Sequence, residues 1–239
     1  MPETYYLDKL YPFQDMILKR IEQLNLDFYL TGGTALGRCY LNHRYSDDLD
    51  FFVNRHKNFK KQCTIAIDAL KKKWMCDVAS TSDTFIRIFV EADEIALKID
   101  FVNDVPSHFG NIEQSSVFHR IDSWRNILSN KICALSWLEV KDIVDIAFTA
   151  KKYSFDWETI LAEAKEKDIW VDPLEICRII DQFPTDLLKT IKWIGNVNID
   201  TIEKQITVIR DDIFAGVVNS LAEDENIKKD ASRGAAEID

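Results

Sequence analysis

Patterns that favour β-strands are confined to the first half of this sequence. Short runs rich in β-branched and aromatic residues occur at 27–33, 47–54, 75–81, 85–92 and 95–103. From about residue 122 onward, apolar residues instead recur at the three- and four-residue spacing of helices. This change predicts an α/β (α+β) fold in which a mixed α/β domain precedes an all-helical one.

The change of pattern also sets the expected domain boundaries. We predict a first domain over residues 1–121 and a helical domain over 122–222. Small and polar residues dominate 223–239, so this stretch is expected to be a flexible tail. Within the helical domain, the spacing predicts helices over 185–194 and 199–222, among others.

Helical spacing marks segments of the first domain as well. They cover 8–25, 34–42 and 58–74, and Pro12 places the firm start of the first helix after itself. The acidic turn at Ala92–Glu94 separates two strand patterns and predicts a hairpin.

Charge and hydropathy exclude several classes of protein. The chain has 30 basic and 40 acidic residues, a net charge of −10, which makes it a poor general binder of polyanions. No apolar run approaches the roughly 20 residues of a membrane-spanning helix, and no signal pattern begins the sequence. We therefore expect a soluble, cytoplasmic protein with no membrane partner.

The cysteines and histidines do not form metal-binding motifs. The five cysteines are dispersed without a CxxC pair, and the four histidines lack HxxxH spacing. A disulfide framework and a structural zinc site are both disfavoured, and free thiols are expected.

Two carboxylates alternate with apolar residues in the stretch "DDLDFFVN". If residues 48–52 are extended, Asp48 and Asp50 share one face, about 6.5–7 Å apart, while Leu49 and Phe51 face the core. Carboxylates this close repel each other unless a cation lies between them, and oxygen ligands suit Mg²⁺ or Mn²⁺. The alternative is a strand end with both acids in water.

A glycine pair precedes this strand. Gly32 and Gly33 end one strand and open a helix, where unpaired backbone N–H groups can hold phosphate oxygens. Thr34 is expected to cap that helix. A glycine pair alone is more often a simple turn, but together with the alternating aspartates it predicts a site for phosphate and metal.

A third acid, Asp100, lies within the apolar strand pattern "LKIDFV". Aspartate is disfavoured in the middle of a strand and is seldom buried without a partner. Asp100 is therefore expected to join Asp48 and Asp50. The alternative is an ion pair with Lys98, which shares its face of the strand.

These residues carry a resemblance to a known family. The segments "GGTAL", "HRYSDDLDFF", "KIDFV", "KICAL" and "KDIVDI" resemble the AbiEii/AbiGii toxin-type family of the DNA polymerase β-like nucleotidyltransferase superfamily, over residues 28–150. The resemblance implies a small mixed β-sheet core with flanking helices, joined to a C-terminal helical bundle domain.

The resemblance also implies roles for the carboxylates and the glycine corner. Asp48 and Asp50 would bind two Mg²⁺ ions, and Asp100 would be the third carboxylate of a two-metal mechanism. Gly32 and Gly33, with Thr34, would hold the triphosphate of an NTP.

Further residues are implied by the later motifs. Lys131 would contact the β- and γ-phosphates, although a solvated helix lysine is the alternative. Asp142 matches the last acidic motif, and Asp145 is an equal contender on spacing. Lys141 replaces the usual arginine before that motif. Arg44 would pair either with a phosphate or with Asp48.

The implied function is transfer of NMP from an NTP to an acceptor hydroxyl. Family members are often the toxin of a bacterial toxin–antitoxin or phage-defence system, so an antitoxin is a candidate partner. Some members of the family transfer nucleotides onto the acceptor ends of tRNA, so tRNA or another RNA is a candidate acceptor. The alternatives are a catalytically inactive binding module with the same fold and a transferase of small molecules, of the aminoglycoside-modifying type.

Overall fold

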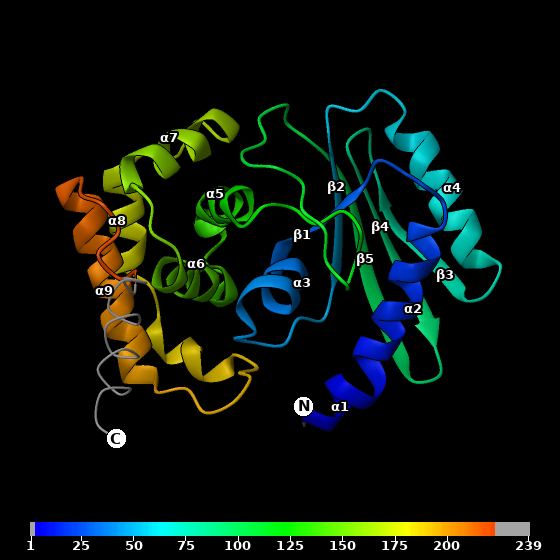
Figure 1. Cartoon of the computed structure of the whole chain (residues 1–239), viewed down its shortest axis with the longest axis horizontal. Coiled ribbons are helices and arrows are strands. Elements are labelled where there is room, and N and C mark those ends of the chain that lie inside the picture. The colour runs from blue at the N-terminus through cyan, green and yellow to red at the C-terminus, as the bar shows by residue number, and fades with distance from the viewer. Residues whose placement is uncertain (1–2, 223–239) are drawn as a thin grey trace, which may run out of the picture. The chain divides into compact units, whose positions relative to one another are not determined.

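The computed structural model describes residues 3–222 (Figure 1). The chain divides into two units: Met1–Asn130 with Thr190–Val197, and Lys131–Lys189 with Asn198–Asp239. This division falls a few residues after the expected boundary at 121, and it returns a short later segment to the first unit. The tail expected over 223–239 lies outside the described residues.

A five-stranded sheet forms the centre of the first unit. Its strands are β1 (Tyr29–Thr31), β2 (Leu49–Asn54), β3 (Met75–Thr81), β4 (Phe85–Ala92) and β5 (Ile95–Asp104). They are arranged in the order β1-β2-β5-β4-β3. Strands β2 and β5 are parallel, whereas the other neighbours are antiparallel. The predicted mixed sheet is confirmed, including the β4–β5 hairpin.

One face of this sheet is apolar because side chains alternate along each strand. In β2, Leu49, Phe51 and Val53 are buried, while the residues between them are partly exposed. Phe51 lies opposite Phe101 of β5, and their rings stack with centroids 5.6 Å apart. Helices α2 (Tyr11–Glu22) and α4 (Phe59–Lys71) cover one side of the sheet (Figure 1) and contribute buried apolar residues to the same core.

The N-terminal helix begins earlier than the sequence predicts. Helical turns run from α1 (Glu3–Tyr5) through the π-helical segment η1 (Tyr6–Leu10) into α2. Pro12 lies in the first turn of α2. Pro12 directly follows the π-helical turn, and the helical run continues through it although proline cannot donate a backbone hydrogen bond. The start expected after Pro12 is therefore wrong.

The thiol of Cys63 is completely buried on α4, and burial raises its pKa to about 12. Because the fold favours the neutral thiol, its contribution to stability is complete below pH 9 and is lost as the pH rises from 9 towards 12. Cys63→Ala should therefore flatten the decline in the free energy of unfolding between pH 8 and 11, as measured by urea denaturation. An unchanged decline would contradict the assigned pKa.

The second unit is helical in its described part. It contains the end of α5 (Trp124–Ala134), then η3 (Leu135–Trp137), α6 (Val140–Lys152), α7 (Trp157–Lys167), α8 (Pro173–Asp181), most of η4 (Thr185–Thr190) and α9 (Ile199–Ala215). Side-chain caps define three of the starts. Asp156, Asp172 and Asn198 each accept a hydrogen bond from a backbone N–H in the first turn that follows.

Two of the helices predicted near the C-terminus are too long. Helix α9 ends at Ala215 because Gly216 adopts a left-handed conformation with φ of +65°, as is common after a helix end. Residues 185–190 form a 3₁₀ helix, and the chain then pairs with the first unit. There Tyr45 N donates to the Lys192 carbonyl at 2.8 Å. The backbone at Lys192 therefore pairs with a distant segment and does not continue the helix.

No helix between residues 3 and 222 combines the length and the apolar character needed to cross a membrane. The five cysteines are free thiols, as expected.

Candidate active site

The register of the sheet brings predicted site residues into one row. Asp50 of β2 lies opposite Asp100 of β5, which in turn lies opposite Arg87 of β4. On the other side, Asp50 lies opposite Thr31 of β1. Because Phe51 and Phe101 face the core, these four residues lie on the opposite, polar face. We call Asp50, Asp100 and the nearby Asp48 the carboxylate group.

Two cations neutralise part of the carboxylate group. Arg87 binds Asp100 with two hydrogen bonds, from Nε to Oδ1 and from Nη2 to Oδ2, each 2.7 Å long. Lys98 Nζ lies 2.6 Å from Asp48 Oδ2. Asp100 is only 7% exposed, so a partner of opposite charge is required there. The expected alternative partner, Lys98, binds Asp48 instead.

All three carboxylates act to raise the pKa values of Arg87 and Lys98. The hydrogen bond to Asp100 raises the pKa of Arg87, and the charges of Asp48 and Asp50 add to this effect. Burial acts to lower the pKa of Lys98, but the hydrogen bond to Asp48 and the other two carboxylates outweigh it and raise that pKa. Each cation is thus stabilised by all three acids.

Gly32 brings the backbone unusually close to the carboxylate group. Its φ is +67°, and a Cβ atom at this position would lie 2.3 Å from Asp50 Oδ2. A Cβ on Gly33 would lie 2.5 Å from Arg44 Nη2. Arg44 is buried and donates through Nη1 to the Tyr45 carbonyl at 3.2 Å. The glycine pair therefore leaves room for Asp50 and Arg44.

Thr34 does not cap the helix as predicted. Helix α3 (Gly32–Ala35) begins at Gly32, so Thr34 lies inside it, and its N-cap residue is Thr31, without a side-chain cap. Thr34 Oγ1 instead donates to the backbone carbonyl of Asp48 at 2.5 Å. Its hydroxyl thus connects the helix after the glycine pair to the start of β2.

Replacing Gly32 with alanine should disturb the site more than replacing Gly33. Alanine at position 32 meets both the unfavourable positive φ and Asp50, so we expect a loss of about 1–3 kcal/mol in the free energy of unfolding. Gly33→Ala meets the far end of a long side chain and should cost less. Urea denaturation of both variants measures the difference, and equal costs would contradict the close approach to Asp50.

Lys131 lies in the second unit with both candidate acids of α6. Its Nζ is 2.6 Å from Asp142 Oδ1 and 2.8 Å from Asp145 Oδ2. The side chains of Lys131, Asp142 and Asp145 are 11%, 6% and 0% exposed. Lys131 is therefore not a solvated surface lysine, and both acids contact the same ammonium. The roles of Lys131 and Asp142 in catalysis stay predictions.

Sequence reasoning overlooked Arg87, and it considered Lys98 only as a partner of Asp100. Arg87 stands between apolar residues in "FIRIFV", the same kind of signal that marked Asp100. A charged side chain inside each of two paired strands could have predicted their contact. The buried acid Asp122, which accepts a hydrogen bond from Thr31 Oγ1 at 2.5 Å, was also missed.

The chemistry of the carboxylate group suits a divalent cation that prefers oxygen ligands. Asp48, Asp50 and Asp100 offer carboxylate oxygens and no sulfur or imidazole, as Mg²⁺ and Mn²⁺ require. The close approach of Gly32 to Asp50 shapes this part of the group. Over residues 3–222, no three His, Cys, Asp or Glu side chains are already arranged as a metal site. Metal binding would compete with the ion pairs of Lys98 and Arg87.

Known structures share this fold. A crystal structure of a candidate nucleotidyltransferase from Helicobacter pylori covers 87% of this chain and 96% of its own, with 20% identity and a TM-score of 0.56. The crystal structure of JHP933 from Helicobacter pylori covers 96% and 98%, again with 20% identity and a TM-score of 0.56. No curated protein matches the sequence. The architecture is that of a nucleotidyltransferase.

A family model places the chain more narrowly within this class. The model for the nucleotidyl transferase AbiEii toxin of type IV toxin–antitoxin systems matches residues 17–196, which is most of the sequence. The chain belongs to this AbiEii nucleotidyltransferase family.

Proposed function

We propose that this chain transfers NMP from an NTP to an acceptor hydroxyl, in a reaction that depends on Mg²⁺ or Mn²⁺. The observation that carries the proposal is the carboxylate group on the polar face of the sheet, beside the Gly32 corner. Family membership supports the class of reaction, and the oxygen-only ligands support the choice of metal.

In this proposal Asp48 and Asp50 hold the metal, and Asp100 is the third acid. A bound divalent cation would lower the pKa of the acceptor hydroxyl and neutralise charge on the triphosphate. Arg87 fixes the orientation of Asp100 through its two hydrogen bonds. The backbone N–H groups at Gly32 and Gly33 lie where α3 begins and would bind phosphate oxygens.

Two further cations have proposed phosphate contacts. Arg44 is buried beside Gly33, so its guanidinium is positioned next to the glycine pair. Lys131 would contribute an ammonium to the β- and γ-phosphates, with Asp142 or Asp145 restraining it. The acceptor is proposed to be tRNA or another RNA, and the partner a cognate antitoxin.

The test is to incubate the protein with each radiolabelled NTP, Mg²⁺ and total cell extract, and then to separate RNA, protein and small molecules. Label on RNA is expected, with EDTA abolishing it. Label on a small molecule would instead support a transferase of the aminoglycoside-modifying type. No labelling with any NTP, in the presence of Mg²⁺ or Mn²⁺, would contradict the proposal.

A second candidate function is a catalytically inactive binding module. The observation in its favour is that Lys98 and Arg87 already occupy Asp48 and Asp100. Titration with Mn²⁺, followed by electron paramagnetic resonance, separates the two candidates. An enzyme should bind Mn²⁺, and Lys98→Ala should bind it more tightly because a competing cation is removed. Absence of Mn²⁺ binding in both proteins would support the inactive module.

A further inference from the structure

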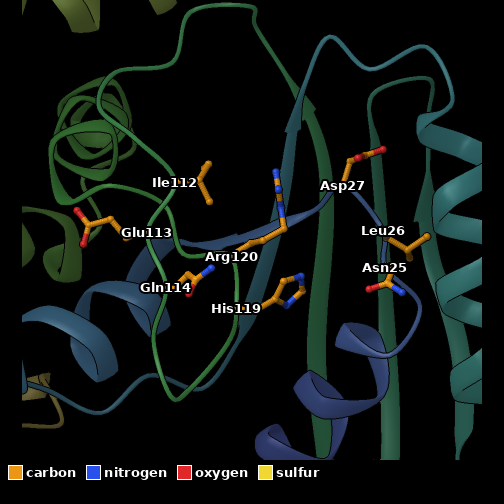
Figure 2. A pocket seen from close by; sticks show the side chains of 8 residues that line it. All are labelled: Asn25, Leu26, Asp27, Ile112, Glu113, Gln114, His119 and Arg120. Carbon is orange, nitrogen blue, oxygen red and sulfur yellow. The ribbon is translucent and has the colours of Figure 1, made fainter.

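Two adjoining cavities lie beside β1 in the first unit. Their volumes are about 410 and 300 Å³, within the range of small-molecule sites. They share Asp27, Ile112 and Arg120, and we call them together the Arg120 pocket. Figure 2 shows the residues lining the larger cavity, with Arg120 in their midst. None of the three carboxylates lines either cavity.

The backbone holds Arg120 firmly against β1. Leu30 N donates to the Arg120 carbonyl, and Asp122 N donates to the Leu30 carbonyl, each at 2.9 Å. Ile121 between them is buried in the core. Arg120 is thereby fixed at the edge of the sheet, and substitution of its side chain leaves these backbone bonds in place.

One nitrogen of the Arg120 side chain lacks a hydrogen-bond partner among the described residues. Its Nε is buried, and within residues 3–222 it has no hydrogen-bond partner. The two acids of the pocket are engaged elsewhere. Asp27 accepts from Gln62 at 2.5 Å and lies 3.2 Å from His56, while Glu113 interacts with Tyr40. A buried guanidinium nitrogen without a hydrogen-bond partner favours binding of an added acceptor, such as the oxygen of an anion.

Three of the four histidines in the sequence line the same pocket. His56 and His108 line the smaller cavity, and His119 lines the larger one. His108 Nε2 lies 2.9 Å from the fully buried Asp122. The His108 ring meets Tyr29 edge to face, with centroids 5.3 Å apart. The pocket thus combines a guanidinium with imidazole rings.

We infer that the Arg120 pocket binds the phosphate ester of a nucleotide, held by the Arg120 guanidinium and placed beside the His108 ring. A guanidinium presents parallel N–H donors that match two phosphate oxygens, and the rings suit the sugar or base of the same ligand. The choice of a nucleotide ester over other anions rests on the proposed function. The source is either a mononucleotide or one phosphate of an RNA strand.

Strand β1 places this pocket near the carboxylate group. Tyr29 lines the smaller cavity, and Thr31, two residues further and about 7 Å along the strand, lies opposite Asp50. Thr31 also bonds to Asp122, the partner of His108. An RNA acceptor whose phosphate is bound at Arg120 would therefore extend along the face that carries the carboxylates.

The test compares Arg120→Gln with the unmodified chain and with Arg20→Gln, a control on α2 whose side chain contacts Gln23 at the surface. Inorganic phosphate, AMP and a short single-stranded RNA serve as probes, and calorimetry measures their affinity. EDTA and the background substitution Asp50→Asn remove the proposed metal site, so the result does not depend on catalysis. We expect Arg120→Gln to weaken binding of the preferred probe about tenfold or more, and Arg20→Gln to leave it unchanged.

NMR of the imidazole protons provides a second readout. The preferred probe should shift the signals of His56 and His108 but not that of His43. Arg120→Lys should bind the probe with intermediate affinity, because lysine keeps the positive charge but lacks the paired N–H donors of the guanidinium. Tighter binding of AMP would assign a mononucleotide, and tighter binding of RNA would assign a strand. Absent binding, or equal binding in Arg120→Gln and Arg20→Gln, would overturn the inference even if labelling by NTP succeeds.

Discussion

Replacing Asp50 with asparagine should lower the rate of nucleotidyl transfer by about a hundredfold to a thousandfold. Asparagine keeps the shape of the side chain beside Gly32 but removes one negative charge from the polar face of the sheet. The proposed metal would lose a ligand and part of the charge that holds it. Asp48→Asn should have a similar effect, because it removes the other ligand and the ion pair with Lys98.

The assay for this prediction is Mg²⁺-dependent labelling by radiolabelled NTP, with circular dichroism and urea denaturation to verify the fold. Asp83→Asn is a suitable control, because Asp83 is an exposed acid of the same unit that pairs with Lys60. Its activity should be unchanged. If Asp48→Asn and Asp50→Asn both retained full activity, the metal site would have to be abandoned.

Replacing Lys131 with methionine should lower the free energy of unfolding by about 3–5 kcal/mol. The substitution leaves Asp142 and Asp145 in a buried environment without the ammonium that contacts both. Like charges then face each other where water cannot screen them. The sequence by itself predicts only a loss of NTP affinity for Lys131→Ala, so the structural effect must be measured separately.

Urea denaturation and calorimetric titration with an NTP distinguish the two roles. Lys165→Met, on the exposed surface of α7, is the control and should change neither quantity. Adding Asp142→Asn and Asp145→Asn to Lys131→Met should recover much of the lost stability, because the buried negative charges that faced the ammonium disappear. If Lys131→Met were as stable as the unmodified chain, the buried ion pairs would not have the energetic importance assigned to them.

The sequence determined most of the local structure of the first unit. Alternating apolar residues predicted β2, β4 and β5 to within one or two residues, because burial of one sheet face repeats every second residue. The same rule placed Asp48 and Asp50 on the face opposite Phe51. The rarity of aspartate in the middle of a strand marked Asp100 as an acid that needed a partner.

Local rules failed where distant segments compete for the backbone. Residues 191–194 have the spacing of a helix, yet the Lys192 carbonyl accepts from Tyr45, which lies far away in the sequence. Thr34 has the residue type of a helix cap, but its hydroxyl bonds to the Asp48 carbonyl. Propensity is a weak preference in both places, and a long-range hydrogen bond outweighs it.

What the sequence by itself determined is the set of charged side chains that must lie on one polar face, since alternation along a strand follows from backbone geometry alone. Only the tertiary structure decided which of them meet. Parallel pairing of β2 with β5 places Asp50 opposite Asp100. Antiparallel pairing of β5 with β4 places Arg87 opposite Asp100, and Lys98 pairs with Asp48. Register between strands depends on how the whole core packs, and no single strand contains that information.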